Sequence, residues 1–328
     1  MNAELMGMLS ITFQASLAVL IVILLGAAMR WRNWLTASAD KPLTDITMNV
    51  LYPAATFCSI RGNENLKDPL FVLWVILVGW ITIAVGMIAA KFFLALFPRL
   101  CGTESDAEKR TFVLCNCLFN YGFLPIPLCL LLFGKQTQGV LFVFNVGTVI
   151  GMWTVAVAVL SKDALRQSFH QLYSAPMIGV YLAILFNYLP CADRLPECIE
   201  TSLKWLNDSM IPLSLVLVGG IMYDEFRAKD RSFAWLKSVK IINSAVFIRM
   251  ILVPALFILG AKYFIADADL QRVIIVQAAM PTAIMSLVWA RQFNGSPATA
   301  LRCVIVTNLL AILTTLIWIP VGRHFIGV

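Results

Sequence analysis

The chain has 328 residues, of which 60% are hydrophobic and only 13% charged, whereas soluble domains carry about 25% charged residues. A soluble fold cannot bury that much apolar surface. The net charge of +7 comes from Lys and Arg residues scattered singly, not from the basic stripe that nucleic acids require. The composition therefore excludes a soluble nucleic-acid-binding domain and indicates an integral membrane protein.

Apolar runs recur along the whole chain, and each approaches the roughly 20 residues that a helix needs to cross a bilayer. No cleaved signal is expected at the start, because residues 1–8 contain Glu4 and no Lys or Arg. The runs predict ten membrane-spanning helices, called spans 1 to 10 in chain order. They lie at 9–29, 43–60, 70–96, 110–132, 139–160, 173–189, 199–222, 239–264, 272–291 and 298–319.

The loops between these spans differ in basic charge on alternate sides of the membrane. Fifteen Lys and Arg residues fall on the side of the first loop and eight on the other. Because short cytoplasmic loops accumulate Lys and Arg, this count predicts a multi-pass protein of the cytoplasmic membrane with both termini outside.

Ten spans divide into two halves of five, and an odd number of spans per half gives the halves opposite topologies. A shift of 159 positions places Asn49 on Asp208 and Pro53 on Pro212, so spans 2 and 7 each carry a polar residue one turn before a proline. The expected fold is all-α, with ten transmembrane helices in a 5+5 inverted repeat, and residues 1–328 form a single transporter unit.

Span 4 contains a segment in which a regular helix is unfavourable. Asn120, Tyr121, Gly122, Pro125 and Pro127 lie within eight positions, and each proline removes a backbone donor. In a membrane such a break is tolerated where it lines a cavity, and the start of the following half-helix suits a carboxylate. The alternative is a packed proline kink in which Gly122 serves close helix contact.

Span 9 contains a milder version of the same feature, with Met280, Pro281, Thr282 and Ser286 in sequence. One proline and several hydrogen-bonding side chains replace the double proline of span 4. We expect these residues either to bind substrate or merely to satisfy carbonyls that the proline leaves free.

Polar residues in other spans provide further candidates. Arg249 and Asp208 are ionisable residues inside predicted spans, and with Asn49 and Asn308 they are candidates for coupling or gating. Arg249 can attract an anion or hold a structural carbonyl, and Asp208 can instead lie near the membrane surface. Asn145 is a second-rank binding candidate, since single polar residues in spans often bond a neighbouring helix.

Enzyme signatures are absent from the sequence. The chain has two histidines, no metal-ligand cluster and no glycine-rich phosphate loop, so we expect no catalytic residue, metal or cofactor. Cys191 and Cys198 flank a loop expected outside, where a disulfide can form.

Four stretches resemble the auxin efflux carrier family, which includes bacterial permeases within the bile acid, arsenite and riboflavin transporter-like superfamily. These stretches are Asn49 to Pro53, Phe119 to Pro127, Arg249 with Pro254, and residues 278–294. The resemblance implies a scaffold part at 9–60 and 173–222, a transport part at 70–160 and 239–319, and broken helices 4 and 9 that cross. It further implies a carboxylate near Asn120 and a crossover proline at Pro127.

The chain departs from the family at two positions: Pro125 stands where bacterial relatives commonly have glycine, and Ser286 where plant carriers have a proline.

The expected function is secondary transport of a small organic anion by alternating access. The anion is a carboxylate or dicarboxylate such as malonate or malate, or an auxin-like acid. Cation/proton antiport or sodium-coupled symport is a first alternative, although spans 4 and 9 lack carboxylates, and a non-transporting receptor is a second. The expected partners are the anion and the lipid bilayer but no nucleic acid, with a proton or sodium ion and a homodimer as open options.

Overall fold

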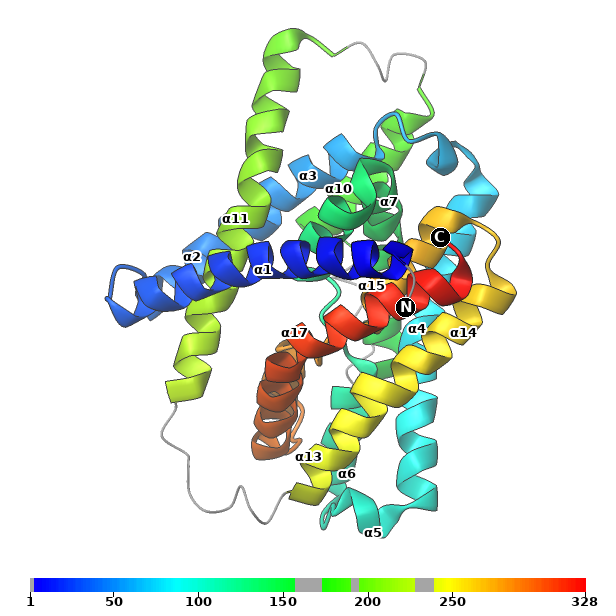
Figure 1. The fold of residues 1–328 in the computed structure, drawn as a ribbon. Coiled ribbons are helices and arrows are strands. Elements are labelled where there is room, and N and C mark those ends of the chain that lie inside the picture. The colour runs from blue at the N-terminus through cyan, green and yellow to red at the C-terminus, as the bar shows by residue number, and fades with distance from the viewer. Residues whose placement is uncertain (1–2, 157–172, 190–194, 228–238) are drawn as a thin grey trace.

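The computed structural model describes residues 3–156, 173–189, 195–227 and 239–328, and within these ranges the chain forms helices and no strand (Figure 1). The first half contains α1 (Ala3–Trp31), α2 (Ala37–Ile46), η1 (Thr47–Leu51), α3 (Tyr52–Ile60), η2 (Glu64–Lys67), α4 (Pro69–Leu96), α5 (Pro98–Cys101), α6 (Asp106–Cys117), α7 (Pro125–Gly151) and η3 (Met152–Ala156). The second half contains α10 (Ala175–Asn187), α11 (Glu197–Arg227), α13 (Val239–Phe247), η4 (Ile248–Leu252), α14 (Val253–Phe264), α15 (Ala268–Ala278), α16 (Met285–Gln292) and α17 (Pro297–Ile326).

Five helical stretches are long and apolar enough to cross a membrane, which makes this a multi-pass membrane protein. They are Met6–Trp31, Pro69–Leu96, Pro125–Ala156, Glu197–Asp224 and Val239–Phe264. A sixth is added if the two arms of α17, bent by 61°, count as one span. The described residues thus provide five or six spans by this measure where ten were predicted. The predicted spans missing from these stretches are 2, 4, 6 and 9. Spans 4 and 9 are interrupted, the helix of span 6, α10, has only 13 residues, and span 2, formed by α2, η1 and α3, does not meet the measure. The stretch Pro125–Ala156 contains the second half of span 4 and also span 5, which meet at a kink at Gly134.

Two spans show why the sequence folds locally as it does. Span 3, predicted at 70–96, is α4, and it begins where the side chain of Asp68 accepts a hydrogen bond from the N–H of Leu70. Span 8, predicted at 239–264, is the continuous run of α13, η4 and α14. Its π-helical turn η4 was not predicted and precedes Pro254, as η1 precedes Pro53. A proline leaves a carbonyl without its usual donor, so a widened turn before it is physically reasonable.

Two groups of helices pack among themselves. In the first group, α1 lies along α11, and α3 contacts α10 and α11. The backbones of α1 and α11 touch, since a Cβ atom on Gly219 would lie 1.9 Å from the carbonyl oxygen of Ile23. In the second group, α4 packs on α7 at Gly147, and α6, α13, α14, α15, α16 and α17 complete the assembly. The groups meet where α1 contacts α7 and α17, and where α3 contacts α7.

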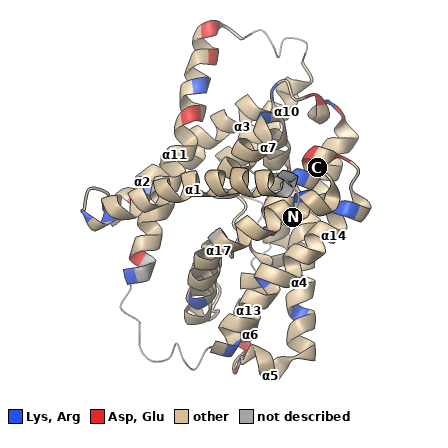
Figure 2. Cartoon of the chain, viewed as in Figure 1, with Lys and Arg blue, Asp and Glu red and all other residues tan. Residues whose placement is uncertain are grey.

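Most charged residues lie at helix ends and in loops, as Figure 2 shows. Arg30 at the end of α1 is buried and forms ion pairs with Asp40 of α2 and with Asp224 of α11, the latter at 3.0 Å. This cluster joins three helices of the first group at one end of the molecule. Because the middle of the helices is apolar, buried polar residues there are candidates for function.

Candidate functional site

The interruption in span 4 extends over residues 118–124, between the end of α6 and the start of α7. The first turn of α7 contains two prolines, and the N–H of Ile126 bonds back to Gly122 at 3.2 Å. The N–H groups of Gly122, Phe123 and Leu124 donate no hydrogen bond within the described residues. Residues 121–124 are half-buried and a Cβ atom on Gly122 would meet nothing within 4 Å. This break is therefore open on one side.

The interruption in span 9 extends over residues 279–284, between α15 and α16, and it lies against the first. Phe119 and Thr282 form an isolated antiparallel bridge. The N–H of Asn120 donates to the carbonyl oxygen of Pro281 at 2.9 Å, and the N–H of Ala283 donates to that of Leu118 at 3.0 Å. Main-chain groups that the two breaks release thus satisfy each other, as buried backbone requires in a membrane.

Side chains from neighbouring helices hold the span 9 break in place. The N–H of Thr282 donates to Thr307 Oγ1 at 3.2 Å, its carbonyl oxygen accepts from Asn308 Nδ2 at 3.1 Å, and its own hydroxyl donates to the carbonyl oxygen of Cys115 at 2.9 Å. All three polar groups of Thr282 are engaged, and residues 279–283 are buried. Ser286, the last predicted residue of this break, is buried in α16.

Arg249 binds the end of α15. Its side chain is fully buried, its Nε donates to the carbonyl oxygen of Met280 at 2.9 Å, and its Nη2 donates to that of Gln277 at 3.2 Å. Its guanidinium carbon lies 4.9 Å from the centre of the Phe119 ring and 5.9 Å from that of Phe257. Arg249 thus holds two carbonyls, while its Nη1 is buried without a hydrogen-bond partner among the described residues, so the expected role in attracting an anion stays a prediction.

A chain of amides connects the two breaks to the first helix group. Gln277 Nε2 donates to Asn145 Oδ1 at 3.3 Å and to the carbonyl oxygen of Tyr121 at 3.4 Å. Asn145 Nδ2 in turn donates to Tyr52 Oη of α3 at 3.5 Å. The sequence reasoning did not select Gln277 as a site residue. The sequence feature that could have identified Gln277 is a single amide inside the otherwise apolar run 273–279.

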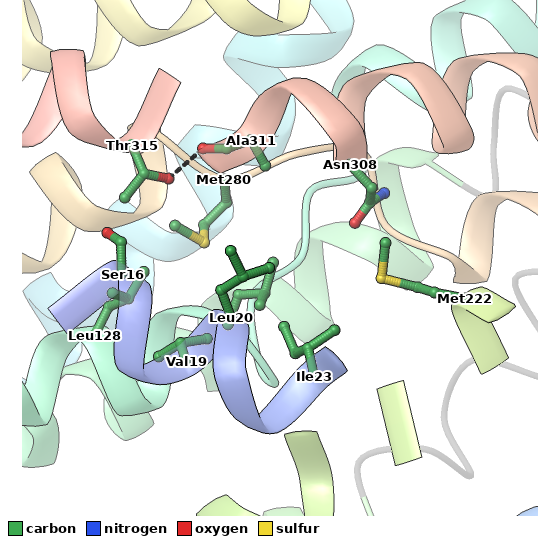
Figure 3. A pocket seen from close by; sticks show the side chains of 11 residues that line it. Ser16, Val19, Leu20, Ile23, Leu128, Met222, Met280, Asn308, Ala311 and Thr315 are labelled. Atoms are coloured by element: carbon green, nitrogen blue, oxygen red, sulfur yellow. Dashed lines mark hydrogen bonds between the residues drawn. The ribbon is translucent and has the colours of Figure 1, made fainter. Parts of the chain in front are cut away.

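A cavity of about 70 Å³ lies where the two helix groups meet, next to both breaks (Figure 3). Apolar side chains dominate its lining, and Ser16, Asn308 and Thr315 supply polar groups. The hydroxyl of Ser16 is buried without a hydrogen-bond partner among the described residues. The full lining is Ser16, Val19, Leu20, Ile23, Leu124, Leu128, Met222, Met280, Asn308, Ala311 and Thr315.

The sequence matches a known family over most of its length. A family described as "Membrane transport protein" matches residues 11–167 and 155–319. The chain belongs to this family. Its members are transporters, not enzymes, as the names of similar proteins also indicate.

Three relatives show the range of this membrane transport family. An uncharacterized transporter of Methanothermobacter thermautotrophicus is 22% identical over 92% of this chain and 95% of its own length. Auxin efflux carrier component 8 of Arabidopsis thaliana is 29% identical over 43% of this chain and 36% of its own length. The Arabidopsis protein PIN-LIKES 7 is 27% identical over 51% of this chain and 44% of its own length. These matches confirm the expected resemblance to auxin efflux carriers.

The remaining site residues predicted from the sequence lie in different surroundings. Asn120 is buried beside the paired breaks, and its side chain forms no hydrogen bond within the described residues, while Pro125 and Pro127 are buried at the start of α7. Asn49 on η1 and Asp208 on α11 are both exposed and neither lines the cavity. Asp208 accepts a hydrogen bond from its neighbour Asn207.

Of the fourteen predicted site residues, Met280 and Asn308 line the cavity directly. Ser16 and Thr315 line it without having been predicted, because isolated hydroxyls in spans 1 and 10 carry no distinctive sequence pattern. Cys191 lies outside the described residues, so the disulfide with the exposed Cys198 stays a prediction.

Proposed function

We propose that this membrane transport protein is a secondary transporter that moves a small organic anion by alternating access. The proposed fold has ten spans in a 5+5 inverted repeat, with spans 4 and 9 crossing at their paired breaks. The hydrogen bonds from Asn120 to Pro281 and from Ala283 to Leu118 support this arrangement. Such discontinuous helices form the substrate sites of many secondary transporters, and a non-transporting receptor has no need of them.

The observation that carries the anion assignment is the open break at residues 121–124. Three N–H groups of this break have no partner within the described residues. They precede the first arm of α7, from Pro125 to the kink at Gly134, whose start bears a partial positive charge. The side-chain amide of Asn120, which forms no hydrogen bond within the described residues, adds a donor beside them. Donors with this arrangement suit a carboxylate.

The cavity lining indicates what accompanies the carboxylate. The cavity is lined mainly by apolar side chains, with few polar groups among them. The apolar side chains include Leu20, Ile23, Leu124 and Leu128. An anion with one carboxylate and an apolar body fits such a lining better than malonate or malate, whose second charge would lose its hydration.

The small volume of the cavity favours a mechanism in which the two helix groups move relative to each other. It measures about 70 Å³, whereas ligand pockets span roughly 300–1,000 Å³. A substrate therefore needs the two helix groups to separate. We assign α1, η1, α3, α10 and α11 to a scaffold and the helices around the breaks to a transport part, in a cytoplasmic membrane with both termini outside.

Uptake of labelled anions into proteoliposomes tests this function. The substrates compared are malonate, malate and an indole carboxylate, and the purified protein should carry at least one of them, with the indole carboxylate expected to be carried fastest. Asn120→Ala should lower uptake by about 10-fold or more, since a hydrogen bond to a charged group contributes roughly 1.5–3 kcal/mol. Asn243→Ala, at an exposed position of α13, is the matched control and should leave uptake unchanged.

The two levels of the proposal fail separately. Uptake of none of the anions by the unaltered protein would overturn the function, and equal uptake by Asn120→Ala would overturn the site.

A further inference from the structure

Arg249 is a buried cation whose charge is balanced in an unusual way. It is fully buried in the middle of span 8, yet no carboxylate contacts it within the described residues. Its partners are the carbonyl oxygens of Gln277 and Met280, which Nη2 and Nε bind, and the faces of Phe119 and Phe257, while Nη1 has no hydrogen-bond partner within the described residues. The end of a helix carries about half a negative elementary charge, and aromatic faces attract cations, so these neutral groups together stabilise the guanidinium.

The carbonyls that Arg249 binds are of a particular kind. They lie at the C-terminal end of a half-helix beside an unwound segment, and in transporters with broken helices such carbonyls coordinate coupling cations. The side chain of the same Gln277 carries a further oxygen, Oε1, which is buried and accepts no hydrogen bond within the described residues. The end of α15 therefore presents the hard oxygen ligands that a monovalent cation prefers, and a guanidinium already occupies two of them.

We propose that Arg249 is a resident cation that fills the place of a coupling sodium ion at the end of α15, so that no alkali cation binds there. The inference rests on the proposed transport function, since it concerns coupling. A fixed side chain cannot dissociate with the substrate, so this end of the site keeps its positive charge throughout the cycle. Arg249 is accordingly a positioning residue that determines which ion the breaks accept.

Thermal unfolding of the purified protein tests this inference without any transport measurement. The unfolding temperature is measured at equal ionic strength in sodium chloride, in N-methyl-D-glucamine chloride, and in the latter with a few per cent of guanidinium chloride in place of the glucamine salt. The unaltered protein should unfold at the same temperature in sodium and in glucamine. Arg249→Ala should be less stable in glucamine and gain about 3 °C or more from sodium or guanidinium, because a cation that binds only the folded state stabilises it.

Two controls separate a cation site from a general effect of salt. Arg249→Lys keeps a charge at the same place and should show no gain from sodium. Arg61→Ala removes an arginine that pairs with Glu200 elsewhere and should show no cation-specific gain.

Two results would overturn the proposal: sodium-specific stabilisation of the unaltered protein, or an Arg249→Ala protein equally stable in all three salts. If Arg249→Ala unfolds during extraction in glucamine, recovery of folded protein on extraction with sodium or guanidinium supports the proposal, and failure with every cation overturns it. A protein inactive in uptake but behaving as expected here would contradict only the proposed function.

Discussion

The break before α7 and the break before α16 lie side by side, yet their polar groups are satisfied in different ways. The N–H, carbonyl and hydroxyl groups of Thr282 bond to Thr307, Asn308 and Cys115, and Arg249 holds the carbonyl of Met280 just before them. Around Gly122, three consecutive N–H groups have no partner within the described residues, and the segment is half-buried. The backbone of the span 9 break is bonded to its neighbours, although the Ser286 hydroxyl beside it has no partner among the described residues, and the span 4 break is open.

This difference indicates that the two interruptions have separate roles in a binding site. A binding site needs donors that are held in position but are not already occupied. The span 9 break supplies the rigid partner, since it pairs with Leu118 and Asn120 and is itself fixed by side chains. The span 4 break supplies the free donors. The backbone pairing with span 9 holds these N–H donors in position. Because they form no other hydrogen bond within the described residues, they are available to bind a ligand.

Hydrogen exchange measures this contrast most directly. In lipid nanodiscs, the amides of Thr282 and Ala283 should exchange about 100-fold more slowly, or slower still, than those of Gly122, Phe123 and Leu124, because bonded and buried amides exchange only through opening. Mass spectrometry of peptides that cover the two breaks provides the measurement. Equal protection of both segments would remove the distinction between an open and a fastened break.

Two glycines allow the same contrast to be tested through stability. A Cβ atom on Gly86 of α4 would lie 2.9 Å from Cys117 Cα, at the end of α6, whereas one on Gly122 would meet nothing within 4 Å. Gly86→Ala should therefore lower the free energy of unfolding by about 1–3 kcal/mol, as overpacking does. Gly122→Ala should change it by less than about 0.5 kcal/mol. Thermal unfolding in detergent measures both, and a larger loss at Gly122 would show that its surroundings are packed.

The positions of the interruptions could be predicted from the sequence. Prolines at 125, 127 and 281 mark the two regions, and the helices are interrupted over 118–124 and 279–284. The first break ends before the prolines that were expected to cause it, because Pro125 and Pro127 lie in the first turn of α7, where an N–H has no helical acceptor to lose. The limits of span 3 and the C-terminal limit of span 8 also agree with the structure, because a long apolar run bounded by Asp68 or by a polar loop leaves little choice. These features depend on local chemistry that a single stretch of sequence contains.

The connections between the spans could not be predicted in the same way. Arg249 and Met280 are 31 positions apart, and nothing in either stretch specifies that one binds the other. The bonds from Gln277 to Asn145 and from Thr282 to Cys115 depend equally on how separate helices pack. Asp208 shows the converse, since a charge inside a predicted span is exposed on α11 and does not line the cavity.

A single hydroxyl offers the most delicate test of the fastened break. Thr282 Oγ1 donates to the carbonyl oxygen of Cys115 at 2.9 Å, and Thr282 is buried but does not line the cavity. Thr282→Val keeps the shape and removes the donor, so it should lower the free energy of unfolding by about 1 kcal/mol. Thr282→Ser retains the hydroxyl and loses only a methyl group, so it serves as the control for the bond.

The comparison of these two variants decides what the bond contributes. If the hydroxyl fastens the break, Thr282→Ser should retain the hydrogen bond and Thr282→Val should expose the amides of 282 and 283 to faster exchange. A valine variant with unchanged exchange at these amides would mean that Thr307, Asn308 and Arg249 hold the break without it, and that the fastening belongs to its backbone and to Arg249.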